Sequence, residues 1–521
     1  MIDERIAKEI YGGKVSKRGE EERLTFENTV SKILEEGHLK STRRACMTLD
    51  ETQEMEVQSK TDIKSDKHIM DNIEITDTGD VCGIYHLLDR RYWFLGETYG
   101  GKIVELYDKL KKQMPDFMEK IDIIQGDMGK PDLGISEEDR NKIINEVEFI
   151  FHGAATVRFD EALKTAVAIN VRGTREILLL ARSCTKLRAH VHISTAYSNC
   201  PLREIDEKFY DSNLPGDKLI DLVENINEET LASITPGLLG EFPNTYSYTK
   251  SAAEDIVRKY SQGLPVAVFR PSIAVFVEPS GTFVYGYFKV VVGAGVGILH
   301  VVLCNPSVIA DMVPGDFVVN GCIATAWKTA RDYPGNHEDA PVDNLPITYN
   351  YVSSEQNPMT WKLFMKYIEV YGMRVPSIQA IWMCLCLITP YEFIYNFYFL
   401  VLHWIPAYIT DFFLVIIGKK PILKKAYAKI KNFSAVIAYF AQREWKFHNG
   451  NTLNLYKEMD ETDKQMFNFD MESLIWEEYM EKYVMGVRIY LLKDPVDTIP
   501  QGRKKQFKLM FKLLYITSYF H

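Results

Sequence analysis

The sequence predicts an α/β fold built around a parallel sheet, and two observations support this prediction. From about Val81 onward, short runs rich in β-branched and aromatic residues alternate with segments of helical apolar spacing. Strands that alternate with helices form βαβ units, in which helices cover both faces of a parallel sheet. Small or polar residues also stand directly after most of these runs. Such sheets bind ligands beyond the carboxyl ends of their strands, which is where those residues would lie.

The expected elements follow one another along the chain. Strands are expected at Gly83–Leu88, Lys120–Ile124, Val147–Phe151, Ala189–Ile193 and Val266–Phe269. Amphipathic spacing predicts helices over Glu161–Cys184 and Tyr248–Tyr260. Residues 1–80 are rich in Glu, Lys, Asp and Thr, which is typical of a charged, partly helical extension. The predicted organisation is therefore an atypical extension over 1–80, a sheet domain over 81–370 and a C-terminal domain over 371–515.

The composition excludes two classes of function. The 61 Lys and Arg residues against 71 Asp and Glu residues leave a net charge of −10, whereas a nucleic-acid binder needs a basic face. Eight cysteines are too few for a disulfide scaffold, and none of them forms a CxxC pair, so neither a zinc ribbon nor a thioredoxin-like site is expected. Met1–Glu22 lacks the apolar core of a secretory signal peptide, which favours a protein whose reduced thiols face the cytosol.

A long apolar segment, residues 375–418, begins the C-terminal region. Val375–Tyr391 and Phe393–Thr410 contain no Asp, Glu, Lys or Arg, and a lysine-rich stretch follows them. Prolines interrupt the segment, so its pattern favours a membrane-associated hairpin or an apolar surface with a basic collar. The alternative is a buried helical pair in a soluble domain.

The chemistry is concentrated around a YxxxK pattern formed by Tyr246 and Lys250. On a helix these two side chains share one face. A neighbouring ammonium lowers the pKa of a phenol, so that the phenol can donate and accept a proton near neutral pH. Ser194 and Thr195 follow an expected strand and offer a hydroxyl that can hydrogen-bond a substrate carbonyl. Thr195 is preferred for this role, and the other hydroxyl could simply end the strand.

Many strings of this sequence resemble the alcohol-forming fatty acyl-CoA reductase family. The first group comprises Gly126–Ser136, Phe151–Leu163, Ile169–Thr174, His192–Cys200, Pro243–Glu254, Phe269–Val275, Val302–Asn320 and Tyr351–Trp361. The second group, Phe440–Asn451, Phe467–Tyr479 and Gly486–Asp494, resembles a domain shared with the plant male-sterility proteins. A hydroxyl, a tyrosine and a lysine in this order also resemble the triad of short-chain dehydrogenases/reductases. The resemblance covers roughly Val81–Tyr515.

The resemblance implies a fold, a reaction and a location. The fold would be a Rossmann-like, doubly wound parallel sheet with a smaller, mostly helical C-terminal domain. The reaction would be the reduction of a long-chain acyl-CoA to a primary alcohol with two NADPH. The membrane of the peroxisome or of the endoplasmic reticulum would be the location, with the catalytic domain facing the cytosol. No metal and no nucleic acid are implied as partners.

The resemblance also assigns cofactor roles to individual residues. Asp127 would contact the adenine, and Gly153, Ala154 and Ala155 would line the cofactor cleft. Asn170 would support the geometry of the site. From the residues alone, Asp127 could equally be a helix N-cap, and the alanines could reflect close packing. His152 and His192, at strand positions, are expected to be core histidines.

The catalytic roles implied by the resemblance fall on three side chains. Thr195 would polarise the thioester carbonyl, Tyr246 would protonate its oxygen, and Lys250 would hold the nicotinamide ribose. Arg90 and Arg91 stand close to where family members carry an arginine that could meet the 2′-phosphate of NADP, so both are candidates for that contact.

The chain departs from the family at the first strand–glycine loop–helix unit. That unit lets the backbone approach the cofactor pyrophosphate. Here Gly83–Arg91 resembles the family's second strand, and Ala45–Asp80 before it holds a single glycine and no such turn. Three explanations stay open: an upstream exon wrongly joined to the reading frame, a variant that binds cofactor weakly, and a non-catalytic, membrane-bound acyl-CoA-binding relative.

Overall fold

The structure is a computed structural model that describes residues 82–86, 91–95, 121–276, 287–333 and 345–519. The predicted extension over 1–80 and Arg90 lie outside the described residues. The chain divides into two compact units, and the larger comprises Thr61–Asp460 with Phe469–His521. The smaller comprises Met1–Lys60 and Glu461–Asn468, of which the structure describes helix α19 (Glu461–Met466). The domain boundaries near 80 and 370 stay a prediction.

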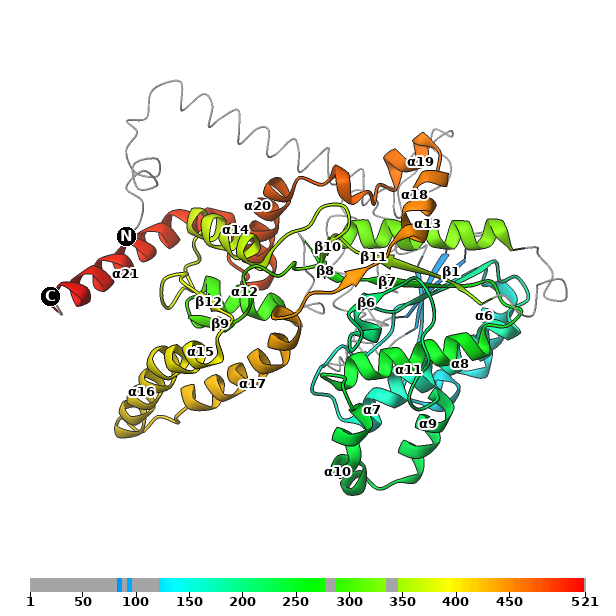
Figure 1. Cartoon of the computed structure of the whole chain (residues 1–521), viewed down its shortest axis with the longest axis horizontal. Helices are drawn as coiled ribbons and strands as arrows, with labels where there is room; N and C mark the ends of the chain where they lie inside the picture. Colours follow the sequence, from blue (N-terminus) through cyan, green and yellow to red (C-terminus); the bar gives the residue numbers. More distant parts are fainter. Residues whose placement is uncertain (1–81, 87–90, 96–120, 277–286, 334–344, 520–521) are drawn as a thin grey trace, which may run out of the picture. The chain divides into compact units, whose positions relative to one another are not determined.

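Seven strands of the described chain form the main sheet in the order β11-β7-β5-β4-β1-β2-β3 (Figure 1). Their bounds are β1 Cys82–His86, β2 Arg91–Leu95, β3 Ile121–Ile124, β4 Phe149–His152, β5 Ala189–Ile193, β7 Val266–Pro271 and β11 Ile347–Tyr351. The pairs β11·β7, β7·β5, β5·β4 and β2·β3 are parallel. The α/β fold class predicted from the sequence is therefore confirmed, and β5 has the predicted bounds.

Strand β1 departs from the parallel arrangement that the sequence predicts for the sheet. It pairs antiparallel with both β2 and β4. The connection between β1 and β2 spans residues 87–90 alone, whereas a parallel connection needs about a dozen residues or more. The first two strands can therefore pair only as a hairpin, and the expectation of a uniformly parallel sheet was wrong at this strand.

Helices cover both faces of this sheet (Figure 1). Helices α8 (Gly173–Ser183) and α11 (Thr245–Tyr260) lie on one face, where Leu178 and Ile256 join Ile150 of β4 and Val268 of β7 in one apolar cluster. Helix α13 (Gly315–Asp332) lies on the other face (Figure 1). It packs so closely that a Cβ on Gly321 would lie 2.7 Å from the Phe269 ring.

The predicted helix over Glu161–Cys184 is in fact three consecutive pieces. These are α7 (Leu163–Val167), the π-helical turn η3 (Ala168–Arg172) and α8. Single π turns inside α-helices often mark functional sites. Helix α11 begins before the predicted Tyr248, because the Asn244 side chain accepts a hydrogen bond from the Ser247 amide at 2.8 Å and so caps it.

The remaining elements before residue 320 connect these layers. They are η2 Pro131–Gly134, α6 Glu137–Glu146, η4 Ala196–Asn199, β6 Glu204–Ile205, α9 Gly216–Asn225, α10 Glu228–Leu239, β8 Ile273–Val275, α12 Tyr287–Gly295, β9 Val301–Leu303 and β10 Met312–Pro314.

The C-terminal part is mostly helical, as predicted. Its elements are α14 Trp361–Arg374, β12 Leu387–Thr389, α15 Glu392–Phe399, η6 Leu400–Trp404, α16 Ile405–Ile416, α17 Leu423–Ala441, β13 Lys446–Phe447, α18 Gly450–Glu458, η7 Met471–Ser473, α20 Trp476–Gly486, η8 Val487–Leu491, η9 Val496–Thr498 and α21 Ile499–Tyr519. Strand β13 pairs in parallel with β6 and so joins this part to the loops of the sheet.

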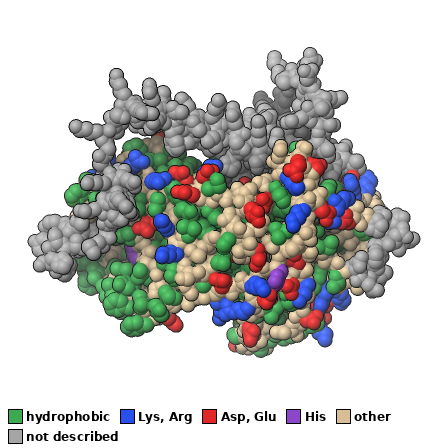
Figure 2. All heavy atoms as spheres, turned by 45° about the horizontal axis from the view of Figure 1, so that its top comes forward, with side chains coloured by type: hydrophobic (Ala, Val, Ile, Leu, Met, Phe, Trp, Pro, Cys, Tyr) green, Lys and Arg blue, Asp and Glu red, His purple; other side chains and the backbone are tan. Residues whose placement is uncertain are grey.

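The segment from α15 to α16 exposes an unusual amount of apolar side chain. Phe393 is 82% exposed, and Phe412, Phe413, Ile416 and Ile417 are each more than half exposed. Figure 2 shows hydrophobic side chains gathered on the side where α15 and α16 lie in Figure 1. Judged by length and composition only, Glu392–Ile416 is the one described helix that is long and apolar enough to cross a membrane. The predicted alternative of a buried helical pair does not describe this surface.

We expect Gly216→Ala to destabilise the fold. A Cβ there would lie 2.6 Å from Ile256 Cγ1 and 2.9 Å from the Ala252 carbonyl oxygen, so α9 would have to move away from α11. Overpacking of this kind costs about 1–3 kcal/mol, measured as the free energy of unfolding in urea. Gly237→Ala in α10 is the matched control, because no atom lies within 4 Å of the added Cβ. Equal stability of the two variants would contradict the close packing of α9 on α11.

Candidate active site

The ends of three neighbouring strands bring the predicted site residues to one edge of the sheet. Strand β4 pairs in parallel with β5, and β5 with β7. Gly153 follows β4, Thr195 stands just after β5, and Ser272 follows β7. Because parallel strands end on the same side, these residues share the carboxyl edge, which is where such sheets bind ligands.

The two candidate hydroxyls at the end of β5 have different surroundings. Ser194 is buried, and its Oγ donates a hydrogen bond to Glu254 Oε1 at 2.6 Å. Thr195 is the N-cap of η4, and its Oγ1 accepts a hydrogen bond from the Tyr197 amide at 3.2 Å. That contact leaves the Thr195 hydroxyl proton available to a ligand, whereas the Ser194 proton is committed to a carboxylate.

Helix α11 carries Tyr246 and Lys250 on one face, one turn apart. Lys250 is 3% exposed, and its Nζ donates to the carbonyl oxygen of Ile193, the residue before Ser194. Burial lowers the pKa of this ammonium to about 8, against the opposing attraction of Glu254. The lysine therefore touches the end of β5 directly.

The phenol of Tyr246 behaves differently from the sequence-based expectation. Burial raises its pKa to about 12, and that desolvation outweighs any lowering by Lys250. The phenol is therefore protonated at neutral pH and ready to give a proton. Its ring lies 5.8 Å from the Phe159 ring, which in turn lies 6.1 Å from the Phe440 ring of α17. The C-terminal part thus contributes the Phe440 ring to a row of three aromatic side chains that includes the tyrosine.

Asn170 ties the loop after β4 to helix α11. It lies in the π turn η3, and its Oδ1 accepts a hydrogen bond from the Thr156 amide at 2.9 Å. Its Nδ2 donates to the Thr156 carbonyl at 3.2 Å and to Thr249 Oγ1 at 2.9 Å. Thr249 stands directly before Lys250, so this amide links the loop after β4 to the helix that carries the lysine.

Asp127 and the small residues after β4 occupy the same edge. The Asp127 carboxylate accepts a hydrogen bond from the Gly129 amide at 2.8 Å and pairs with Lys130 at 3.4 Å, while 27% of the side chain stays exposed. Ala154 and Ala155 are buried, and Gly153 is exposed. The structure thus places these four of the predicted cofactor residues, Asp127, Gly153, Ala154 and Ala155, beyond strand ends.

Arg91 lies elsewhere. It is the first residue of β2 and pairs with His86 of β1. Because β1 runs antiparallel to β4, with Tyr85 opposite Phe149, this end of the hairpin is at the amino edge of the sheet. That edge is opposite to Thr195, so the placement does not support the predicted contact of Arg91 with a cofactor phosphate. The reason is the short 87–90 connection, which reverses the chain direction.

His152, His190 and His192 are buried in the core, as expected for His152 and His192 from their strand positions. The Nδ1 atoms of His152 and His192 lie 3.1 Å apart, in register across β4 and β5. Burial lowers the pKa of all three imidazoles, so they are neutral at physiological pH.

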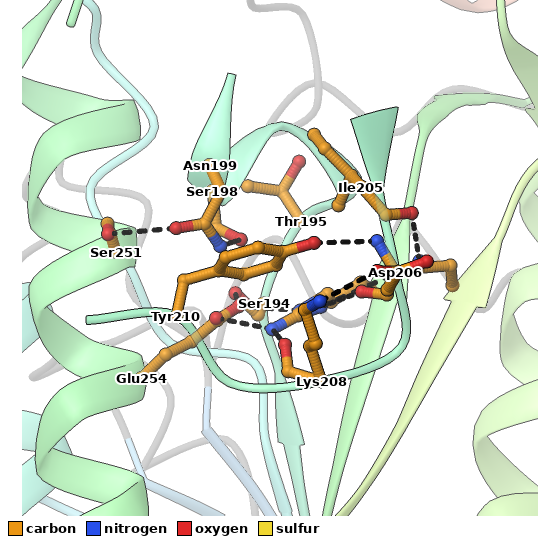
Figure 3. Close-up of polar contacts among 12 residues, drawn as sticks. Ser194, Thr195, Ser198, Asn199, Ile205, Asp206, Lys208, Tyr210, Ser251 and Glu254 are labelled. Carbon is orange, nitrogen blue, oxygen red and sulfur yellow. Dashed lines mark hydrogen bonds and ion pairs between the residues drawn. The ribbon is translucent and has the colours of Figure 1, made fainter. Parts of the chain in front are cut away.

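Two charged residues of the site were not singled out from the sequence. Arg270 is the last residue but one of β7 and is fully buried, and Glu254 lies one turn beyond Lys250 on α11. Figure 3 shows Glu254 pointing toward Ser194, close to the end of β6 at Ile205 and to Asp206 and Lys208 of the loop that follows. Two signals were present in the sequence: an arginine at the end of the apolar run Val266–Phe269, and a glutamate four residues after Lys250.

A strand-end hydroxyl beside a helix that carries tyrosine and lysine four residues apart is the arrangement of short-chain dehydrogenases/reductases. The described fold and site place the chain in that class.

Comparison with known proteins narrows the class to a family. Two family models, each described as "Male sterility protein", match residues 102–322 and 402–494, and the first is an NAD-binding model. Fatty acyl-CoA reductase wat of Drosophila melanogaster is 38% identical over 418 residues, which is 79% of this chain and 79% of the relative. Fatty acyl-CoA reductase 2 of Bos taurus is 35% identical over the same shares of both chains. The chain therefore belongs to the fatty acyl-CoA reductase family.

One solved structure found in the comparison is the terminal R domain of the myxalamid PKS-NRPS biosynthetic pathway. The match covers 78% of this chain and 85% of that structure's chain, with 18% sequence identity and a TM-score of 0.46.

We expect Asn170→Ala to destabilise the protein by about 1–3 kcal/mol, because the Thr156 amide would be left buried without a partner. Unfolding in urea measures the change. Asn145→Ala is the control, since its side chain makes an exposed hydrogen bond to Asn141 within one helix. If both variants lost the same small amount, the Asn170 bridge would not hold the loop to α11.

Proposed function

We propose that this protein reduces a long-chain fatty acyl-CoA to a primary alcohol and consumes two NADPH. The observation that carries the proposal is the juxtaposition of Thr195, Tyr246 and Lys250 at the carboxyl edge, in a chain that belongs to the fatty acyl-CoA reductase family. The non-catalytic alternative is not favoured, because the hydroxyl, the phenol and the ammonium are all retained.

The donor set at the carboxyl edge fits a nicotinamide dinucleotide. The exposed part of the Asp127 carboxylate can accept a hydrogen bond from an adenine amino group, and the Lys250 ammonium can donate to ribose hydroxyls. The exposed Gly153 leaves room for the backbone to approach a phosphate. When bound, the nicotinamide supplies the hydride. NADPH as the preferred form is part of the proposal.

The chain's own residues orient the acyl group and donate the proton that the carbonyl oxygen takes up. Thr195 donates a hydrogen bond to the thioester carbonyl oxygen and so polarises the carbonyl carbon. Tyr246, protonated at neutral pH, transfers its proton to that oxygen as charge develops. The first reduction leaves a thiohemiacetal, which expels the CoA thiol and becomes an aldehyde. Tyr246 regains a proton from solvent, and the same residues then serve the second reduction, of the aldehyde to the alcohol.

We expect Tyr246→Phe to lower acyl-CoA-dependent oxidation of NADPH by at least about 10²-fold, because the proton donor is lost. The assay follows NADPH absorbance with palmitoyl-CoA, and NADH in parallel tests the preference for NADPH. Tyr260→Phe is the control. Tyr260 stands at the other end of α11 from Tyr246, and its hydroxyl donates a hydrogen bond to Asp217 of α9. Full activity of Tyr246→Phe would remove the tyrosine from the mechanism, and wild-type protein that binds palmitoyl-CoA without turnover would favour the non-catalytic relative.

We further propose that the surface of α15 and α16 sits in the interface of an anionic membrane, such as that of the endoplasmic reticulum or the peroxisome, with the active site on the cytosolic side. The exposed apolar side chains of this surface support the proposal. A basic collar adjoins them, made of Lys419, Lys420, Lys424, Lys425, Lys429 and Lys431, all exposed. The Asp411 carboxylate accepts hydrogen bonds from the amides of Ile422, Leu423 and Lys424, which holds the collar next to α16.

We expect the triple substitution Phe393→Ser, Phe412→Ser, Phe413→Ser to reduce co-sedimentation with phosphatidylserine-containing vesicles at least tenfold. Raised salt should weaken the wild type in part, since each lysine contributes about 1 kcal/mol near an anionic surface. Val319→Ser is the control, because Val319 is 46% exposed on α13, away from this segment. Undiminished binding of the triple variant would show that another surface meets the membrane.

A further inference from the structure

Helix α11 continues its functional face beyond Lys250. Tyr246, Lys250 and Glu254 stand at successive turns, so the three side chains follow one line along the helix. Glu254 is 3% exposed. A carboxylate taken this far out of water needs partners of its own, and those partners fix where its charge lies.

Arg270 and Ser194 supply these partners. Arg270 Nε donates to Glu254 Oε1 at 2.9 Å, and Nη2 donates to Oε2 at 2.7 Å. Ser194 Oγ donates to Oε1 at 2.6 Å. Both carboxylate oxygens are therefore occupied, and the planar guanidinium prevents the carboxylate from rotating away.

Arg270 is itself held from the other side. Its Nη1 donates to the Asp206 carbonyl oxygen at 3.1 Å, and its Nη2 donates to the Lys208 carbonyl oxygen at 2.8 Å. Figure 3 shows this loop and Glu254 converging around one point. The Glu254–Arg270 pair thus connects α11 and the end of β5 to β7 and to the loop after β6.

Lys250 needs a negative charge close by. Its ammonium is buried and donates to a neutral carbonyl, that of Ile193. Tyr246 stands one turn away on the same helix, His152 of β4 and His192 of β5 interact electrostatically with the ammonium, and Arg270 of β7 pairs with Glu254. In the described chain, none of these four carries a negative charge at neutral pH, and Glu254 is the carboxylate that acts on the ammonium.

We propose that Glu254, held by Arg270 and Ser194, is a positioning residue that keeps the buried Lys250 in its ammonium form and thereby sets the alkaline limit of the reductase reaction. This inference rests on the proposed function. Nothing is transferred to or from Glu254; its charge acts through Lys250, which holds the cofactor ribose and adjoins Tyr246.

Loss of the Glu254 charge should move the alkaline limb of the pH–activity profile, which is the fall in activity at high pH, in a definite direction. In the wild type, activity should fall as Lys250 loses its proton, near pH 8. Removing the carboxylate removes a stabilising charge, so the ammonium loses its proton at lower pH. Side chains four residues apart on a helix are neighbours, and an adjacent opposite charge is worth about one unit of pKa or more. Glu254→Gln should therefore move the alkaline fall in activity down by about one pH unit. Near pH 6 this variant should stay within a few-fold of the wild type.

The experiment measures kcat/KM with palmitoyl-CoA from pH 5.5 to pH 9.5, together with the NADPH dissociation constant from nucleotide fluorescence over the same range. Asp255→Asn is the matched control: it removes one charge from the next position of α11, where Asp255 pairs with Arg258 at 2.7 Å. Its alkaline limb should stay near pH 8. Ser194→Ala keeps the charge and removes one hydrogen bond, so its limb should also stay near pH 8, whatever its rate.

Two results would overturn the proposal. One is a limb that stays near pH 8 in Glu254→Gln while the rate falls equally at every pH, which would mean a purely structural role. The other is an equal shift in Asp255→Asn, which would mean that general surface charge is responsible. If Glu254→Gln does not fold, Glu254→Asp decides instead, because it draws the carboxylate back by one methylene and should shift the limb in the same direction by less. If the wild type binds NADPH without turnover, the proposed function fails, and the pH dependence of NADPH binding still tests Glu254.

Discussion

The parallel pairing of β4, β5 and β7 is the constraint on which the rest of the structure depends. It brings the loop after each strand to the same edge of the sheet, although these loops stand far apart in the sequence. Thr195 is then available beside α11, and Lys250 can donate to the last carbonyl of β5. Had β5 run in the opposite direction, Thr195 would stand at the edge opposite to the residues that follow β4 and β7.

The site is held together from inside by polar groups that would be costly if unpaired. Asn170 binds the loop after β4 to α11, and the Glu254–Arg270 pair binds α11 to β5 and β7. Each of these side chains connects segments that the apolar cluster alone would leave free to slide. Directional bonds therefore supply the alignment, and apolar burial supplies most of the stability.

The C-terminal part takes part in the same construction. Phe440 packs near Phe159 beside the tyrosine, and Glu207 accepts hydrogen bonds from the amides of Asn350 and Thr452 at 3.0 and 3.2 Å. Glu207 stands between Asp206 and Lys208, whose carbonyl oxygens accept hydrogen bonds from Arg270. The loop after β6 is thus fastened to the sheet on one side and to the start of α18 on the other.

Local pattern in the sequence determined much of this protein: the α/β class, the bounds of β5, the carboxyl end of β3 and the pairing of Tyr246 with Lys250 on one helical face. These features depend on residues near one another in the chain, so periodicity and motif spacing reveal them. The tertiary structure alone decided that β1 reverses and leaves Arg91 at the wrong edge, and that the Ser194 hydroxyl is committed to Glu254. It also showed that burial, more than the neighbouring lysine, sets the pKa of Tyr246. Each of these depends on groups brought together from distant positions, and desolvation in particular cannot be read from the sequence around a single residue.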